Sequence, residues 1–192
     1  MSDEASSAQE RAGAAANPAP QRHVVFSHGL ASGPWGRKIT ALAEVVRSEG
    51  YEAHSVDYRG LDAPRERIAR LADYCKDLTG DLVLVGSSLG GYVTVASASV
   101  LHARGIFLMA PALYFPELPQ LRAGIVDCPT VVVHGWRDEV VPFAHSVRFA
   151  EHYRAAPHLL DSDHNLHNQI RVIQNLFEYF LIALDLPAPA GE

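Results

Sequence analysis

The sequence is poor in the features that mark several classes of protein. It contains only two cysteines, Cys75 and Cys128, which form no close pair and match no metal-ligand spacing. It also lacks any stretch approaching the roughly 20 apolar residues that span a bilayer. These absences argue against a disulfide-stapled secreted domain and an integral membrane protein, and they favour free thiols in the reducing environment of the cytoplasm.

Concentrated positive charge is missing as well. The chain has 16 lysines and arginines against 22 aspartates and glutamates, a formal net charge of -6, and its charged residues are scattered along the sequence. Nucleic acids and anionic membranes are bound mainly by clustered basic side chains. We therefore expect no nucleic-acid partner and no membrane partner.

The two ends of the chain have little that could form a core. Residues 1–21 contain no large apolar residue after Met1, and residues 187–192 read PAPAGE. Such segments cannot bury enough apolar surface to fold, and the first also lacks the apolar stretch of a signal peptide. We predict a disordered arm over 1–21, one domain over 22–186 and a flexible tail over 187–192.

Between these ends, short apolar runs alternate with segments of helical periodicity. The runs expected to be strands are 24–26, 53–56, 82–85, 106–109, 131–133 and 159–160. Helices are expected over 39–46, 68–78 (ending near Gly80) and 92–101, from about Pro142, and over 170–181. Strict alternation of this kind predicts an α/β fold, a doubly wound, mostly parallel six-stranded sheet with helices on both faces. In such sheets the functional residues gather at the carboxyl ends of the strands.

The alternation of predicted strands and helices is interrupted over residues 110–128. This segment holds three prolines and has little periodicity. We predict a loop over the functional end of the sheet, with one turn of helix around 118–121.

The segment LVLVGSSLGG places two serines between glycines directly after a buried strand. Gly86, Ser88 and Gly90 fit the pattern G-x-S-x-G, in which a sharp turn projects the central serine above the sheet. Ser88, not Ser87, then occupies the tip of the turn, and the backbone N–H of Leu89 at the start of a helix could face a developing oxyanion. A simple Gly/Ser-rich turn is the alternative interpretation.

A serine nucleophile requires a base and a group that orients the base. Asp138 lies a few residues beyond the strand at 131–133, and His164 lies just beyond the strand at 159–160. Both would therefore lie on the same edge of the sheet as Ser88, in the chain order Ser, Asp, His. Glu139 and His167 are their respective rivals.

A metal site in the loop that carries His164 is not expected. The stretch DSDHN alternates oxygen ligands as a calcium loop does, but Leu166 replaces the sixth-position glycine and Val172 the twelfth-position glutamate. His164 and His167 could share an ion, yet no nearby cysteine or further histidine completes a ligand set. The sequence predicts no metal and no cofactor.

The segment His28-Gly29 after the first strand can turn the backbone N–H of Leu30 toward the reaction centre as a second oxyanion donor. Aromatic residues in loops near the same edge could form a substrate pocket, although such residues often only pack. They are Trp35, Tyr114, Phe115 and Trp136.

From about residue 22 to residue 184 the chain resembles the α/β-hydrolase superfamily. The resemblance lies in His28-Gly29, Gly86-x-Ser88-x-Gly90, His134-Gly135-x-x-Asp138 followed by Val141-Pro142, and Asp163-His164. It implies a hydrolase of small-molecule esters or thioesters in which Ser88 is the nucleophile, His164 the base and Asp138 the group that orients it. It also implies an oxyanion hole made by the amides of Leu30 and Leu89, and no cofactor.

The resemblance is to the small, single-domain serine hydrolases of this superfamily. Residues 110–128 are too few for a cap domain, so substrates of capped relatives do not carry over. A catalytically silent binding module on the same fold is the alternative function, because a fold does not dictate an activity.

Overall fold

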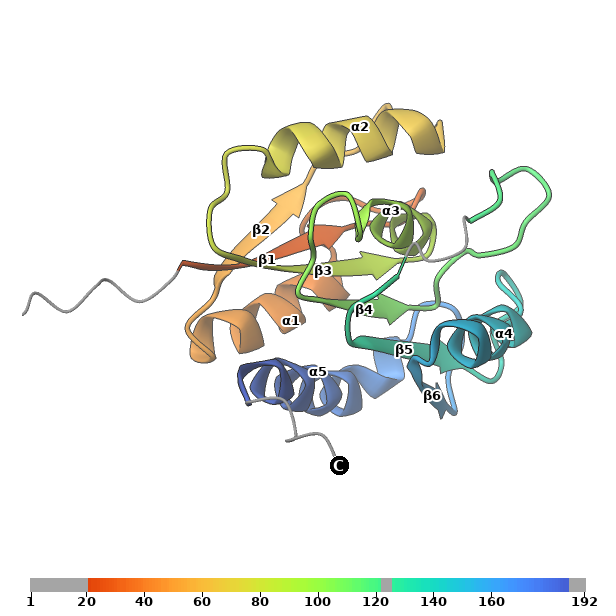
Figure 1. Ribbon diagram of the computed structural model, residues 1–192. Helices are drawn as coiled ribbons and strands as arrows, with labels where there is room; N and C mark the ends of the chain where they lie inside the picture. The colour runs from red at the N-terminus through yellow and green to blue at the C-terminus, as the bar shows by residue number, and fades with distance from the viewer. Residues whose placement is uncertain (1–20, 122–125, 187–192) are drawn as a thin grey trace, which may run out of the picture.

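Six parallel strands form the central sheet of the computed structural model, which describes residues 21–121 and 126–186 (Figure 1). The strands are β1 (Arg22–Ser27), β2 (Glu52–Val56), β3 (Asp81–Ser87), β4 (Gly105–Met109), β5 (Thr130–Gly135) and β6 (Ala156–Leu160). Their order is β2-β1-β3-β4-β5-β6, and every neighbouring pair is parallel. The predicted doubly wound α/β sheet is confirmed.

Helices cover both faces of the sheet. They are α1 (Arg37–Ser48), α2 (Pro64–Cys75), α3 (Leu89–Ser97), α4 (Phe143–Tyr153) and α5 (Ile170–Asp185), with a short 3-10 helix η1 (His167–Gln169). The helices α1 and α5 pack together below the sheet in Figure 1, and α2 and α3 pack together above it. Each face therefore has its own apolar core, one containing Leu42 and Phe177 and the other Leu71 and Val93.

Two helices have boundaries that differ from the predictions. The helix α2 ends at Cys75 rather than near Gly80; Leu78 instead lies in a turn, where its N–H donates to the carbonyl of Cys75 (3.1 Å) and its side chain packs against the core. The helix α3 begins at Leu89 rather than Tyr92, immediately after the turn at Ser88, and ends at Ser97 rather than Leu101. Apolar spacing predicted a longer α2 because a turn can bury a side chain just as a helix does.

The order of the strands locates the functional end of the sheet. From β1 the chain moves out to the edge strand β2, then returns across β1 to β3, and each later strand is added on the other side. The direction of winding thus reverses between β1 and β3. In open parallel sheets, ligands bind beyond the carboxyl ends of the strands at such a reversal. The residues at this point are His28, after β1, and Ser88, after β3.

The segment after β4 contains no helix within its described residues 110–121. The expected turn of helix at 118–121 is wrong. The chain instead turns where the N–H of Leu118 donates to the carbonyl of Phe115 (3.0 Å), and the Tyr92 hydroxyl donates to the carbonyl of Pro119 (3.0 Å). Prolines lack the N–H that a helix needs, which is consistent with this irregular path.

The predicted disordered arm and flexible tail fall almost entirely outside the described part of the chain. Apart from Gln21, residues 1–21 and 187–192 lie outside the described residues. Within the described ranges, no helix combines the length and the apolar character that crossing a membrane requires.

Candidate active site

The turn at Ser88 has a conformation that is costly for a residue with a side chain. Ser88 has φ 55° and ψ -123° between β3 and α3, and strained backbone of this kind costs on the order of 1–3 kcal/mol. Its N–H donates to the carbonyl of Met109 (3.1 Å), and its own carbonyl accepts from Gly91 and Ala112 (2.9 Å each). Bonds from two other segments thus hold the strained residue in place.

The glycines of the motif are required by close backbone approach. A Cβ at Gly86 would lie 2.5 Å from the carbonyl oxygen of Gly90, and a Cβ at Gly90 would lie 2.0 Å from that of Ser27. Any larger residue would push α3 away from the sheet. The two serines differ in their access to solvent. Ser87 is only 6% exposed in β3, whereas Ser88 is partly exposed at the tip of the turn.

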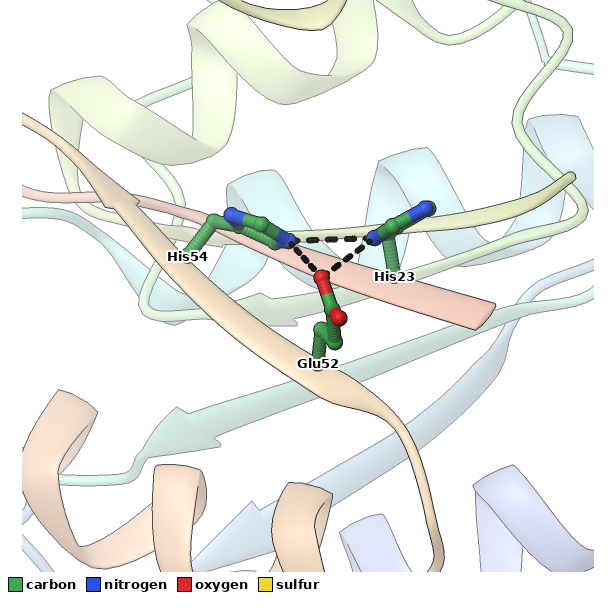
Figure 2. A group of neighbouring side chains, drawn as sticks. All are labelled: His23, Glu52 and His54. Atoms are coloured by element: carbon green, nitrogen blue, oxygen red, sulfur yellow. Dashed lines mark hydrogen bonds and ion pairs between the residues drawn. The ribbon is translucent and has the colours of Figure 1, made fainter. Parts of the chain in front are cut away.

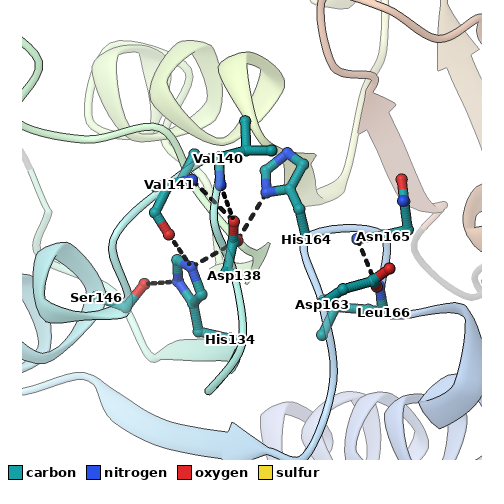
Figure 3. Close-up of polar contacts among 9 residues, drawn as sticks. All are labelled: His134, Asp138, Val140, Val141, Ser146, Asp163, His164, Asn165 and Leu166. Atoms are coloured by element: carbon teal, nitrogen blue, oxygen red, sulfur yellow. Dashed lines mark hydrogen bonds and ion pairs between the residues drawn. The ribbon is translucent and has the colours of Figure 1, made fainter.

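Asp138 is buried in the turn after β5, and its carboxylate accepts four hydrogen bonds (Figure 3). Its Oδ1 accepts the N–H groups of Val140 (2.9 Å) and Val141 (2.8 Å). Its Oδ2 accepts Nδ1 of His164 (2.7 Å) and Nε2 of His134 (2.9 Å). Burial by itself raises the pKa of the Asp138 carboxyl, but these donors outweigh it and hold the pKa below its usual value. Asp138 is therefore an anion at neutral pH.

The hydrogen bond to Asp138 determines which nitrogen of neutral His164 carries the proton. A carboxylate only accepts, so Nδ1 of His164 must be the donor and Nε2 keeps its lone pair. The loop that carries this histidine is anchored on both sides. Before it, the N–H of Arg137 donates to the carbonyl of Ser162 (2.9 Å), and after it Leu166 is fully buried in the core. A base at Nε2 of His164 would thus have a defined position.

The rivals of these two residues are placed differently. Glu139 is exposed, and His167 begins η1. Gly135 explains why the loops after β5 and β6 can meet, since a Cβ there would lie 2.3 Å from the carbonyl oxygen of Ser162. The structure brings Asp138 and His164 together where the loops after β5 and β6 meet.

His134 is a further histidine at this site, to which the sequence analysis assigned no role of its own. It is fully buried, and its Nε2 faces two acceptors, Asp138 and the carbonyl of Val141 (3.0 Å), so Nε2 carries the proton. Its Nδ1 then accepts from the hydroxyl of Ser146 on α4 (2.6 Å). Burial lowers the pKa of His134, which keeps it neutral. A hydrogen-bonded chain therefore runs from Ser146 through His134 and Asp138 to His164 (Figure 3).

The loop after β1 lies against the turn at Ser88. A Cβ at Gly29 would be 3.2 Å from that of Ser88. The loop is braced by His28, whose Nε2 accepts the N–H of Tyr58 (3.0 Å) and whose Nδ1–H donates to the carbonyl of Gly29 (2.7 Å). The buried guanidinium of Arg67 donates to the carbonyl of His28 (3.2 Å). Leu30, the residue that follows Gly29, is exposed.

The four aromatic residues predicted to bind substrate do not form one group. Tyr114 and Phe115 line a cavity of about 330 Å³ together with residues 116 and 118–121, and the guanidinium of Arg148 stacks over the Tyr114 ring (4.2 Å). Trp136 is half exposed and packs edge-on against Phe143 (4.8 Å), and Trp35 is half exposed in the loop before α1. Neither tryptophan lines that cavity.

Lys38 on α1 is another group near the site that the sequence did not single out. Burial lowers the pKa of its amine to about 8, while the negative charges of Asp138 and Asp163 act in the opposite direction. Its charge therefore begins to fall just above neutral pH.

Solved structures include several with this fold. A protein of the α/β-hydrolase superfamily from Xanthomonas campestris pv. campestris is 32% identical, with a TM-score of 0.77 over 85% of this chain and 99% of its own. Est1E from Butyrivibrio proteoclasticus, also solved with ferulic acid bound, is 20% identical (TM-score 0.71, 88% and 90% covered). A Xanthomonas campestris α/β serine hydrolase without a lid is 21% identical (TM-score 0.67, 89% and 85% covered).

The last two likenesses concern the fold alone, because their sequence identity is low. None of the curated proteins matches the sequence. Residues 24–188, however, match the profile of the family described as "Alpha/beta hydrolase family". With this match across most of its length and a 32% identical relative of the same superfamily, the chain belongs to the α/β-hydrolase family.

Proposed function

We propose that the protein is a serine hydrolase of small carboxylic esters or thioesters, with Ser88 as nucleophile, His164 as base and Asp138 as the group that orients the base. The observation that supports this most is the 2.7 Å bond between Nδ1 of His164 and the ionised Asp138, at the same end of the sheet as the strained turn of Ser88. That bond leaves Nε2 of His164 free to accept a proton.

The chemistry follows from these roles. Nε2 of His164 takes the hydroxyl proton of Ser88 as the oxygen attacks the substrate carbonyl, and the carbonyl π electrons move onto its oxygen. Collapse of this intermediate expels the alcohol or thiol, which takes the proton from His164 and leaves an acyl group on Ser88. A water molecule, deprotonated by His164, then attacks the acyl carbonyl. The bond to the Ser88 oxygen breaks, Ser88 takes the proton back from His164, and the acid is released. Asp138 stabilises the imidazolium that forms in both halves of the reaction.

Two backbone amides are proposed to hold the oxyanion. Leu89 is the first residue of α3, so its N–H has no acceptor within the helix, and the positive end of the helix dipole points the same way. Leu30 follows Gly29, which packs against Ser88, and its N–H is proposed as the second donor. Preorganised donors of this kind contribute about 3–4 kcal/mol each to transition-state stabilisation.

The acyl or alcohol group is proposed to occupy the cavity lined by Tyr114 and Phe115. Trp35 and Trp136 lie outside this cavity and are proposed to contact only a part of the substrate that projects from it. The segment that carries Tyr114 and Phe115 is hydrogen-bonded to the backbone of the proposed nucleophile, because the N–H of Ala112 donates to the carbonyl of Ser88.

The experiment that tests this function is a screen of p-nitrophenyl esters and acyl thioesters with purified protein. Hydrolysis that disappears in Ser88→Ala supports the proposal. The alternative, a catalytically silent binding module, predicts that no acyl ester or thioester is turned over at all. Ligand binding that is unchanged in Ser88→Ala would favour that alternative.

We expect a preference for short acyl chains of about two to six carbons, since each extra methylene stabilises the transition state by about 0.8 kcal/mol only while it stays covered. Only 19 residues, 110–128, with three prolines, are available to cover the site. The measurement is kcat/KM for p-nitrophenyl esters from acetate to palmitate. A steady increase past about ten carbons would show a deep covered channel and contradict this prediction.

His134 is predicted to position Asp138 without touching the substrate. His134→Leu, which keeps the size of the side chain but removes its donor, should lower kcat about tenfold, the value of one hydrogen bond to a charged group, with little change in KM. Removing that donor destabilises the ionised carboxylate and holds it less firmly, so Asp138 orients His164 less well.

The control variant is His134→Gln, whose side-chain N–H can replace the donor and should restore kcat. Thermal melting of both variants measures how much stability each loses, so that a loss of positioning can be told from a loss of folded protein. Equal losses of kcat in the two variants would show that His134 has only a packing role.

A further inference from the structure

A second cluster of titratable side chains lies at the opposite end of the sheet from Ser88. His23 is the second residue of β1, and Glu52 and His54 lie two residues apart on the same side of the edge strand β2 (Figure 2). His23 and Glu52 are register partners, so the three side chains converge above the α2 face of the sheet. The carboxyl ends of the strands carry the proposed active site, and this cluster lies near the amino ends.

The three potential ligand atoms lie at the distances from one another that the ligands of a single metal ion have. Nδ1 of His23 lies 3.1 Å from Nε2 of His54, and Oε2 of Glu52 lies 3.4 Å and 3.5 Å from these two nitrogens. Bonds of about 2.0–2.2 Å to a tetrahedral zinc ion place neighbouring ligands about 3.3–3.6 Å apart. A single ion between the three atoms would therefore need only small movements of the side chains.

The outer nitrogens of the two imidazoles orient the inner ones. Nε2 of His23 lies 3.1 Å from the carbonyl of Thr79, which only accepts, so Nε2 carries the proton and Nδ1 presents its lone pair to the cluster. Nδ1 of His54 contacts the hydroxyl of Tyr74 (3.3 Å) on α2 and can donate to it, which leaves Nε2 of His54 with its lone pair inward. Histidines that bind metals are held by outer partners of this kind.

Burial also suits a metal site. The side chain of His23 is 4% exposed and that of His54 is 17% exposed, whereas that of Glu52 is 67% exposed. The cluster is thus enclosed on the histidine side and open to solvent on the carboxylate side, where a water molecule could complete the coordination.

We propose that His23, Glu52 and His54 bind a divalent zinc ion with three protein ligands and one water. Two imidazoles and one carboxylate form a ligand set that suits zinc and leaves a fourth position open. The ion would join the edge strand β2 to β1 through side chains, in addition to their backbone pairing. It stabilises this edge of the sheet and takes no part in the chemistry at Ser88.

No local pattern in the sequence indicates this site. His23 and Glu52 are separated by 28 residues, and the prediction of no metal rested on the spacing of the two cysteines and on the loop that carries His164. Parallel pairing of β1 with β2 brings these side chains together.

The test uses full-length protein treated with EDTA and dialysed. Calorimetric titration with zinc chloride should give one tight site, and saturating zinc should raise Tm by roughly 5–10 °C, because an ion that binds only the folded state stabilises it. Cobalt(II) should give the intense visible bands of a four-coordinate site, a readout that is independent of stability.

Glu52→Gln and His54→Gln should each weaken zinc binding roughly tenfold or more and remove the rise in Tm. The matched controls are Glu44→Gln and His152→Gln, two exposed residues on α1 and α4 that should leave binding unchanged. Ester hydrolysis should be the same with zinc and with EDTA.

Equal zinc binding by the cluster variants and the control variants would mean adventitious binding only and would overturn the proposal. Absence of a Tm rise would also overturn it. In that case Nε2 of His54 donates a hydrogen bond to Nδ1 of His23, and the Tyr74 hydroxyl donates to Nδ1 of His54. The cluster is then held together by these hydrogen bonds rather than by a metal ion. Neither result bears on the hydrolase function, which is measured separately at Ser88.

Discussion

Replacing Ser88 with alanine should lower the turnover of a small ester by roughly four to six orders of magnitude, the scale for loss of a triad nucleophile. The expected loss is large because no other hydroxyl shares its position. Ser87 is buried in β3, whereas Ser88 is partly exposed in a strained turn that the flanking Gly86 and Gly90 permit. The measurement is kcat/KM for p-nitrophenyl acetate with both proteins at equal concentration.

The matched control is Ser87→Ala, which removes the neighbouring hydroxyl and should retain most of the activity. A fluorophosphonate should label the wild-type protein once, and mass spectrometry should map the adduct to Ser88. An adduct on Ser87, or active protein without any adduct, would refute the assignment. Because Ser88→Ala keeps the same backbone strain, its thermal melting should differ little from that of the wild type.

His164→Ala should abolish ester hydrolysis, with a loss of roughly four to six orders of magnitude, similar to that of the nucleophile because the two residues act as a unit. His164 is the partner of buried Asp138 at 2.7 Å, and its removal leaves Ser88 without a base. Fluorophosphonate labelling of Ser88 should slow in parallel, since that reaction needs the same base. Both rates are measured at neutral pH.

The control for this variant is His167→Ala, three residues further along the chain in η1, which should leave most of the activity. The opposite pattern, an inactive His167→Ala and an active His164→Ala, would reverse the assignment of the base. Asp138 keeps the N–H groups of Val140 and Val141 and the imidazole of His134 as donors in His164→Ala. We therefore expect the variant to fold, so loss of activity can be read as loss of the base.

The sheet is the feature that the sequence predicts most completely. Central strands such as β3 and β4 are continuous aliphatic runs buried on both faces, and such runs are recognisable without any knowledge of their neighbours. The edge strand β6 was expected only over 159–160, yet it begins at Ala156. Its first two residues are exposed, so no run of apolar residues in the sequence marks the part of β6 that begins to pair with β5.

The candidate site is predictable from the sequence to a smaller extent. The turn around Ser88 has a local steric cause, because the glycines at positions 86 and 90 are needed wherever this turn forms. Asp138 and His164 were placed at strand ends on the same edge, and the structure shows the hydrogen bond between them. Their catalytic roles, like that of Ser88, stay predictions that the variants above will test.

The alternation of strands and helices, the two-sided burial of the sheet and the glycines of the turn at Ser88 can be recognised in the amino-acid sequence, because each depends on residues only a few positions apart. Which distant groups meet follows from the way the chain folds. Folding joins Asp138 to His164 and His134 to Ser146, and it brings His23 beside the two side chains of β2. These contacts depend on the order of the strands and on where each turn aims its side chains, and no local periodicity encodes either.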